Sequence, residues 1–100
     1  MMTIALDGDQ LTIALSGDVD ATTAYLPYEA AVEQFDEHEI REVVIDLAEV
    51  TFADSTALGT LVRIRDHAVE HGATCHLSNV PDHLRMLLNI TGLDQTLEIS

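Results

Sequence analysis

With 100 residues, of which 47% are hydrophobic, the chain can build one compact core but is too short for two, so we expect a single domain over residues 1–100. Its 18 acidic residues stand against four arginines and no lysine, and the resulting net charge of −14 repels nucleic-acid phosphates and anionic membranes alike. Because no apolar run reaches the roughly 20 residues that span a bilayer, we predict neither a nucleic-acid partner nor membrane insertion.

The first half of the chain predicts a hairpin followed by a helix. Two apolar runs, residues 3–6 and 10–15, are separated by Asp7-Gly8-Asp9, and Asp-Gly is a strong signal for a hairpin turn. Apolar residues then recur at helical spacing from 24 to 35, with Pro27 in the first turn, where a proline is tolerated. A charged connection leads from this helix to the next strand.

The second half predicts strands that alternate with helices. Residues 43–47 form a β-branched run typical of a central strand, and residues 55–71 carry the pattern of an amphipathic helix that ends at Gly72. A third helix begins at Val80-Pro81-Asp82, with the proline in its first turn, and ends before Gly92. The remaining short strands are residues 74–77 and 96–99.

The order of these elements decides the fold class. Two strands come first, and three helices then alternate with three further strands. A helix that joins two parallel strands crosses over the face of the sheet. We therefore predict an α/β fold with a mixed, mainly parallel β-sheet, an N-terminal hairpin and crossover α-helices that cover the parallel part.

The predicted helix 55–71 has two different faces. One broad stripe is apolar and predicts core packing; it consists of Ala57, Leu58, Leu61, Ile64, Ala68 and Val69. The opposite face begins with small residues, so the backbone of another protein could approach it closely. That face consists of Thr56, Gly59, Thr60, Arg63, His67 and Glu70. We interpret it as a candidate docking face.

Asp54, Ser55 and Thr56 stand at the head of this helix. Asp54 is placed as the N-cap, and local chemistry by itself favours a capping role alone. A phosphate on Ser55 would add about −1.5 to −2 charges, which the positive end of the helix dipole tolerates. A partner packed over the small residues would have to desolvate that charge beside Asp54. Since a loss of about 3 kcal/mol weakens binding roughly hundredfold, phosphorylation of Ser55 would be a binding switch.

Four segments, taken in order, resemble one protein family. Leu15–Asp20 (LSGDVD) matches an LxGxxD element, and Val43–Phe52 (VVIDLAEVTF) matches a strand ending in DLxxVxF. Asp54–Gly59 (DSTALG) matches a DS(S/T)GLG signature, and Leu87–Ile99, with Thr91-Gly92-Leu93, matches the usual ending. The chain thus resembles the STAS domain family, in particular its anti-sigma factor antagonists, bacterial proteins that bind an anti-sigma factor and so release a sigma factor.

The resemblance implies roles for particular residues. Ser55 aligns with the serine that the cognate anti-sigma factor, a serine kinase, phosphorylates with ATP and that a metal-dependent serine phosphatase restores. Asp18, Asp20 and Asp54 align with acidic residues near that serine that help in partner binding. The complete set of expected partner-binding residues is Asp18, Asp20, Asp54, Ser55, Thr56, Gly59, Thr60 and Arg63.

One residue departs from the signature, because Ala57 stands where the family has glycine. Alanine favours a helix by about 1 kcal/mol over glycine, so the fold is not affected. We expect the added methyl group, two residues from Ser55, to lie where a kinase loop has to come close. This favours an alternative function, in which the chain is a non-phosphorylated STAS accessory subunit of a lipid-transport ABC complex or part of a stress-signalling scaffold.

The sequence offers two other possible kinds of site, an enzyme active site and a metal site. An enzyme would use Ser55 as nucleophile and one of the five histidines as base, but the nucleophile elbow G-x-S-x-G is absent, so we predict no enzyme and no catalytic residue. His67 and His71 have metal-ligand spacing with Glu70 nearby, yet the helix offers no further ligand, and we expect two surface histidines without a metal. No glycine-rich phosphate loop is present, and no cofactor is expected.

The compartment is inferred from the cysteine count and the N-terminal residues. Cys75 is the single cysteine, which allows no internal disulfide, and its apolar surroundings predict a small buried hydrophobe. The first ten residues, MMTIALDGDQ, lack the basic region of a secretory leader, so we expect a cytoplasmic protein. The lysine-free composition fits either a high-salt cytoplasm or a genome that favours arginine. The oligomeric state stays open.

Overall fold

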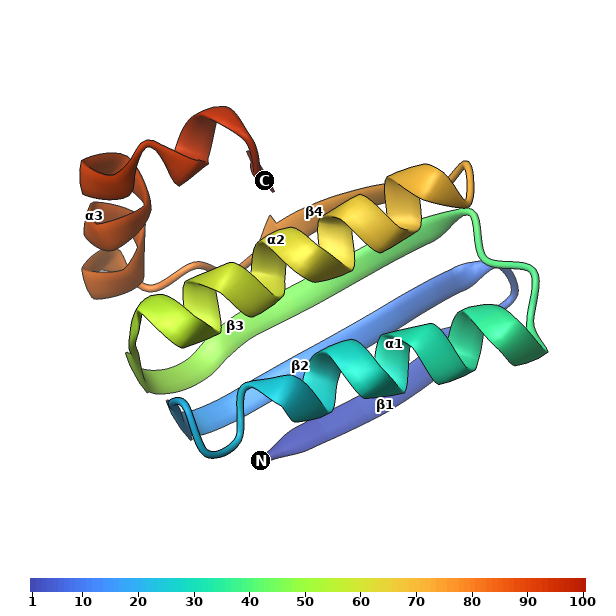
Figure 1. The fold of residues 1–100 in the computed structure, drawn as a ribbon, viewed down its shortest axis with the longest axis horizontal. Helices are drawn as coiled ribbons and strands as arrows, with labels where there is room; N and C mark the ends of the chain where they lie inside the picture. The colour runs from blue at the N-terminus through green and yellow to red at the C-terminus, as the bar shows by residue number, and fades with distance from the viewer.

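The computed structural model describes all residues, 1–100, and its elements follow the predicted order (Figure 1). The strands are β1 (Met2–Asp7), β2 (Gln10–Val19), β3 (Glu42–Ala53), β4 (Thr74–Ser78) and β5 (Glu98–Ile99). The helices are α1 (Tyr25–Glu37), α2 (Ser55–Glu70) and α3 (Asp82–Thr91), and a 3₁₀ turn at Leu93–Gln95 precedes β5.

The five strands form one sheet in the order β1-β2-β3-β4-β5. β1 pairs with β2 in the antiparallel direction, whereas β2, β3, β4 and β5 are parallel to one another. Ile13 lies opposite Ile4 on one side and Ile45 on the other, so apolar residues share one face across neighbouring strands. The predicted α/β fold, with its N-terminal hairpin and mainly parallel sheet, is confirmed.

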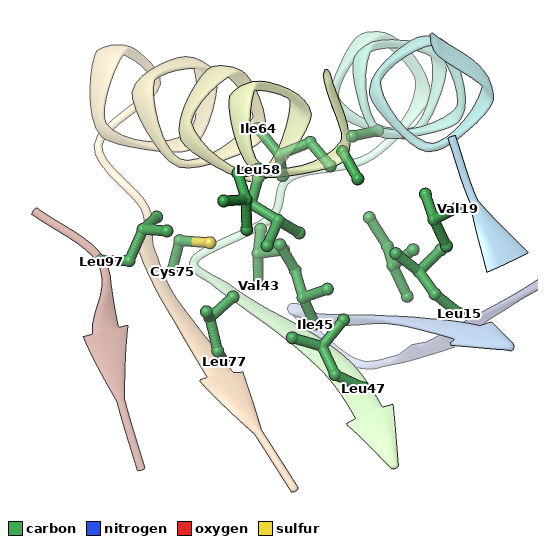
Figure 2. Close-up of a cluster of buried hydrophobic side chains, with 14 of the residues drawn as sticks. Leu15, Val19, Val43, Ile45, Leu47, Leu58, Ile64, Cys75, Leu77 and Leu97 are labelled. Carbon is green, nitrogen blue, oxygen red and sulfur yellow. The ribbon is translucent and has the colours of Figure 1, made fainter. Parts of the chain in front are cut away.

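The core lies between this sheet face and the two long helices. α1 and α2 lie side by side over the same face, and the side chains of the central strands point toward them (Figure 1 and Figure 2). Complete burial of a Leu, Ile or Val side chain contributes about 1.5–3 kcal/mol. The fully buried residues of β2, β3 and β4 are Leu11, Ile13, Val43, Ile45, Leu47 and Leu77.

The opposite face of the sheet carries no helix, so the prediction that helices cover the parallel strands holds for one face only. Apart from Val44, the residues at the centre of this face are small or polar, and they are only half-buried; they include Thr12, Ala14, Asp46 and His76. A sheet face with water on one side needs polar residues there, which explains why β2 and β4 alternate in polarity instead of being apolar throughout.

Two strands are longer than predicted. β2 continues through Ser16–Val19, a segment whose Gly17 and Asp18 are typical of a turn, because these residues pair with the equally extended end of β3. Gly17 has φ +75°, a backbone conformation that favours glycine, and it lies where the register between β2 and β3 shifts. The end of β3 therefore reaches Ala53, directly before α2.

The helix ends agree closely with the prediction. Pro27 lies in the first turn of α1, and Gly72 has φ +77°, which stops the chain from continuing α2. α3 differs slightly, because Pro81 is its N-cap residue and the helical turns begin at Asp82. No helix is long and apolar enough to cross a bilayer.

Cys75 on β4 is buried, as predicted. Burial among apolar groups raises the pKa of its thiol to about 12, and the thiolate is the form that reacts. The thiol is therefore a packing group and not a reactive one.

Candidate functional site

The turn between β3 and α2 and the loop between β2 and α1 lie at the same end of the molecule (Figure 1). Asp54 stands in that turn as the N-cap of α2, and its Oδ1 accepts a hydrogen bond from the Ala57 N–H at 3.0 Å. Its Oδ2 accepts a second one from the Ala21 N–H, in the β2–α1 loop, at 3.2 Å. The predicted cap is confirmed, and the same carboxylate also fastens the neighbouring loop to the helix head.

An exposed strip follows Asp54 along α2. Ser55 is the first residue of the helix, and because Asp54 makes the capping bonds, the serine hydroxyl is not engaged in them. Thr56 and Gly59 are also exposed, and a Cβ built on Gly59 meets no atom within 4 Å. Arg63, also exposed, places its guanidinium carbon 4.1 Å from the centre of the Tyr28 ring, a cation–π contact that holds it at the α1 side of the strip.

Thr60 does not belong to this strip, which corrects its expected place on the docking face. Its side chain is 4% exposed, and its hydroxyl donates a hydrogen bond to the Ala24 carbonyl at 2.8 Å. The physical reason is that α1 lies beside α2 on the sheet, so α2 is buried over a wider arc than a single apolar stripe indicates. Thr60 holds the two helices together and offers no contact to a partner.

Two acidic residues lie on the β2 side of the site. Asp18 is exposed near the end of β2, in the strand and not in a loop, and its Oδ1 accepts a hydrogen bond from the Thr51 hydroxyl at 2.9 Å. Asp20 begins the loop, and its Oδ1 accepts bonds from the Thr22 hydroxyl at 2.6 Å and the Thr22 N–H at 2.9 Å. The Thr22 hydroxyl and then its N–H lower the pKa of the Asp20 carboxyl, since both favour the charged form.

The geometry thus joins a capped helix head, an exposed serine and two acidic residues, Asp18 near the end of β2 and Asp20 at the start of the next loop. The model of the STAS domain matches residues 2–100 of this sequence. This chain belongs to the STAS domain family. The sequence resemblance to that family is confirmed over nearly the whole chain.

Similar proteins agree with this assignment. A STAS-domain containing protein of Pseudomonas aeruginosa is 36% identical over 94 residues, which cover 94% of this chain and 91% of that protein. The anti-sigma-B factor antagonist of Listeria monocytogenes is 36% identical over 93 residues, 93% of this chain and 81% of that protein. The solved structure of the Bacillus cell fate determinant SpoIIAA in its phosphorylated form superposes with a TM-score of 0.79 over 100% of this chain and 91% of that one, at 13% identity, which shows a shared fold.

Ala57, the departure from the STAS signature, lies in the core, as its place on the apolar stripe predicts, and not where a kinase loop would have to come close. Its side chain is 3% exposed and points into the core, where it lines a small apolar cavity together with Val50, Leu61 and Leu84. The methyl group is therefore buried among apolar side chains of the core and not at the surface. The added methyl therefore fills core space and cannot obstruct a loop that approaches Ser55 from outside.

Two aromatic residues near the site were missed by the sequence interpretation. Phe52, paired with Asp18 in the sheet register, is 52% exposed, and Tyr25 in the first turn of α1 is 51% exposed. Strict alternation does not predict this exposure, since counted from the buried Val50 it would place Phe52 in the core; the register shifts between β2 and β3 turn the ring outward instead. Large exposed apolar groups beside polar ones are typical of an interaction surface.

Of the two histidines expected at the surface, His71, the C-cap residue of α2, is exposed, whereas His67 is not a simple surface residue. The His67 ring is half-buried, packs edge-on against Phe35 at 5.2 Å between ring centres, and lies 4.3 Å from the ring of His71. The Nδ1 atom of His71 is 2.8 Å from the His67 carbonyl oxygen. No group of three His, Cys, Asp or Glu residues is arranged to hold a metal ion. These rings therefore serve to pack α2 against α1.

Proposed function

We propose that this protein is an anti-sigma factor antagonist, which binds an anti-sigma factor and so releases a sigma factor. The relative named anti-sigma-B factor antagonist, 36% identical over 93% of this chain, supports the proposal. The observation that carries it is the position of Ser55, which is exposed as the first residue of α2 while Asp54 makes the capping bonds. A modification there changes the surface without disturbing the cap.

The docking surface in this proposal is the end of the molecule around Ser55. Small exposed residues of α2 let a partner backbone approach, and exposed aromatic rings supply apolar anchors of the kind that dominate interface energy. Acidic side chains surround them, so the partner surface has to supply positive charge. The proposed contact residues are Asp18, Asp20, Tyr25, Phe52, Asp54, Ser55, Thr56, Gly59 and Arg63.

Phosphorylation of Ser55 by the anti-sigma factor, acting as a serine kinase, would end the interaction. In the free protein the phosphate stays solvated, because Ser55 is exposed. In the complex it would be desolvated beside Asp54, whose two oxygens already accept backbone N–H bonds and stay in place. A serine phosphatase would restore the binding form, and both partners would meet the protein in the cytoplasm, where sigma factors act.

The proposed role is binding and not catalysis. Ser55 would need a general base to act as a nucleophile, within about 2.6–3.2 Å of its hydroxyl. No histidine forms a hydrogen bond with Ser55, and His71 instead contacts the carbonyl oxygen of His67. This arrangement supports a non-enzymatic function.

The alternative function, an accessory subunit of a lipid-transport ABC complex or a stress-signalling scaffold, rested on the methyl group of Ala57. Because that methyl is buried, it gives no reason to expect that Ser55 escapes phosphorylation. The two functions differ in whether Ser55 carries phosphate, and the following experiment separates them.

The test is to incubate the protein with the anti-sigma factor of its own organism and ATP, and to measure the intact mass. Wild type and Thr56→Ala should gain one phosphate, whereas Ser55→Ala should gain none. Thr56→Ala is the matched control, because Thr56 is the neighbouring exposed hydroxyl on the same helix turn. Calorimetry with the same partner should show full binding for Ser55→Ala and binding weakened roughly hundredfold for Ser55→Asp, equivalent to about 3 kcal/mol.

Phosphate on Ser55→Ala, or equal affinity of the Asp and Ala variants, would contradict the switch. Absence of binding for every variant, with the chain folded, would contradict the antagonist function itself and favour the accessory-subunit alternative.

A further inference from the structure

β1 forms one edge of the sheet, and the hydrogen bonds at its start reveal which backbone groups face outward. The Met1 amino group donates to the Ser16 carbonyl at 2.7 Å, and the Ser16 N–H donates to the Met1 carbonyl at 2.8 Å. Residues that exchange both bonds alternate along an antiparallel pair with residues that exchange none. The odd-numbered residues of β1 therefore bond to β2, and the even-numbered residues, Met2, Ile4 and Leu6, direct their N–H and C=O groups away from the sheet.

This edge lacks the features with which proteins usually prevent strands from pairing. Such features are prolines, lysines, bulges and very short strands. β1 is six residues long, pairs with β2 in an unbroken register, and contains no proline or lysine. Its only charged residue is Asp7, at the end of the strand. The outer side of β1 is thus a regular row of free donors and acceptors.

We propose that β1 pairs antiparallel with β1 of a second copy of this chain, about a two-fold axis at Ile4, so that the two sheets become one. In this register Ile4 lies opposite Ile4 of the second copy, and Met2 lies opposite Leu6 of the second copy. Each such pair exchanges two backbone hydrogen bonds. On the other face Thr3 meets Ala5. No two like charges are opposed within the paired segment, so the strand is complementary to itself, as a two-fold interface requires.

The association is weak and depends on salt. Stable interfaces bury about 1,200–2,000 Å² in total, and pairing along one six-residue strand buries less. Each copy carries a net charge of −14, and the two copies repel each other at low ionic strength. Since charge interactions are screened beyond about 3 Å at 1 M salt and beyond about 10 Å at 0.1 M, added salt strengthens the dimer. This inference does not depend on the proposed function, because no partner protein takes part.

The test is sedimentation velocity of the full chain from micromolar to millimolar concentration, at low and high salt. Wild type should change from monomer to dimer as both rise. Ile4→Pro removes an outward N–H that β2 does not use, and it should remain monomeric, whereas its control Ile4→Val should dimerise. Ala5→Asp provides an independent variant, because Ala5 is exposed and its replacement does not disturb the core. This variant should weaken the dimer at least tenfold. Its control, the uncharged isostere Ala5→Asn, should weaken the dimer less.

Amide hydrogen exchange identifies the surface directly. In the dimer the amides of Met2, Ile4 and Leu6 should become protected, while those of Thr3 and Ala5 are protected in monomer and dimer alike. A wild type that stays monomeric under all conditions overturns the proposal. So does a dimer whose stability is unchanged in Ile4→Pro and Ala5→Asp, because a different surface, such as the exposed Met86 and Ile90 of α3, would then form the contact.

Discussion

The two halves of β3 differ in what they present to the rest of the molecule. In the first half, buried residues alternate with half-buried ones, at Val43, Ile45 and Leu47. In the second half, burial recurs at every third residue, at Val50 and Ala53. The register with β2 shifts twice in this second half, and each time β3 contains one residue more than β2. Bulges of this kind let a core strand continue while it turns new side chains toward solvent.

The comparison teaches how one strand can serve both the core and the proposed docking surface. Phe52 is exposed because it falls between Val50 and Ala53, the buried positions of the bulged half. Asp54 comes directly after Ala53. The regular half of β3 contributes buried side chains to the core, and the bulged half contributes exposed side chains to the proposed docking surface. Substitutions should therefore separate stability from binding according to which half of β3 they affect.

The largest expected effect on stability is that of Ile45→Ala. Ile45 is 0% exposed, and truncation of a buried isoleucine typically costs about 2–5 kcal/mol. Phe52→Ala, in the bulged half, should change the free energy of unfolding by less than about 0.5 kcal/mol. In binding to the anti-sigma factor the order reverses, with a loss of about tenfold or more for Phe52→Ala and little change for folded Ile45→Ala. Urea denaturation and calorimetry measure the two quantities.

A large stability loss in Phe52→Ala would show that both halves of β3 serve the core. Unchanged affinity in that variant would remove the aromatic ring from the proposed docking surface.

The intermediate effect is expected at Asp54, which follows the bulged half of β3 and caps α2. Asp54→Ala loses the cap and the bond to the β2–α1 loop, and should destabilise the fold by about 1–2 kcal/mol. Asp54→Asn keeps one side-chain oxygen, which can still cap α2, and should lose only about half as much. Thermal unfolding of both variants tests this order. Equal losses would mean that the cap retained by Asp54→Asn contributes nothing, and no loss in Asp54→Asn would mean that the bond to Ala21 contributes nothing.

The smallest effect is expected at Asp20 and depends on pH. Bonds from Thr22 lower the pKa of this carboxyl in the folded state below its ordinary value of 3.8. The charged form therefore stabilises the fold above that value, and this contribution is lost as the pH falls through the lowered pKa. Wild type should be more stable than Asp20→Asn at about pH 7, and the difference should vanish in strong acid.

Thr22→Val is the control for this measurement, since it leaves the carboxyl but removes the donor that contributes most to the shift. Its stability should depend on pH less than that of wild type but more than that of Asp20→Asn, because the backbone N–H of residue 22 still lowers the pKa of the carboxyl. A difference between wild type and Asp20→Asn that persists in acid would assign the effect to packing instead of charge.

The element order of the fold could be predicted from the sequence because its signals are local. Asp7-Gly8-Asp9 gives the hairpin turn, and Gly72 lies after the last turn of α2. The extension of β2 could not be predicted, since Gly17 and Asp18 favour turns and only pairing with the end of β3 keeps them in the sheet. The open sheet face was missed for a similar reason, because local periodicity does not show on which face each helix packs.

The site was predictable where it depends on one helix and not where it depends on two. Asp54 as cap and Ser55 as an exposed residue follow from their positions at the head of α2. Thr60 was misplaced because its burial comes from α1, whose Ala24 carbonyl accepts its hydrogen bond. Ala57 was predicted correctly as a core residue of the apolar stripe. Only the expectation that its methyl group lies where a kinase loop approaches was wrong, because nearness to Ser55 in sequence does not give the direction of a side chain on a helix.

The two hydrogen bonds of the Asp54 carboxylate also bear on the entropy of association. A loop that becomes ordered only on binding costs about 0.5–1.5 kcal/mol for each side chain that it immobilises. Here the β2–α1 loop is already fastened to the head of α2 before any partner arrives, through the Ala21 N–H. A partner then meets a pre-organised surface, and most of the gained contact energy remains available as affinity. Removing this carboxylate would thus lower the affinity through the cost of ordering the loop, in addition to any contact that Asp54 itself makes with the partner.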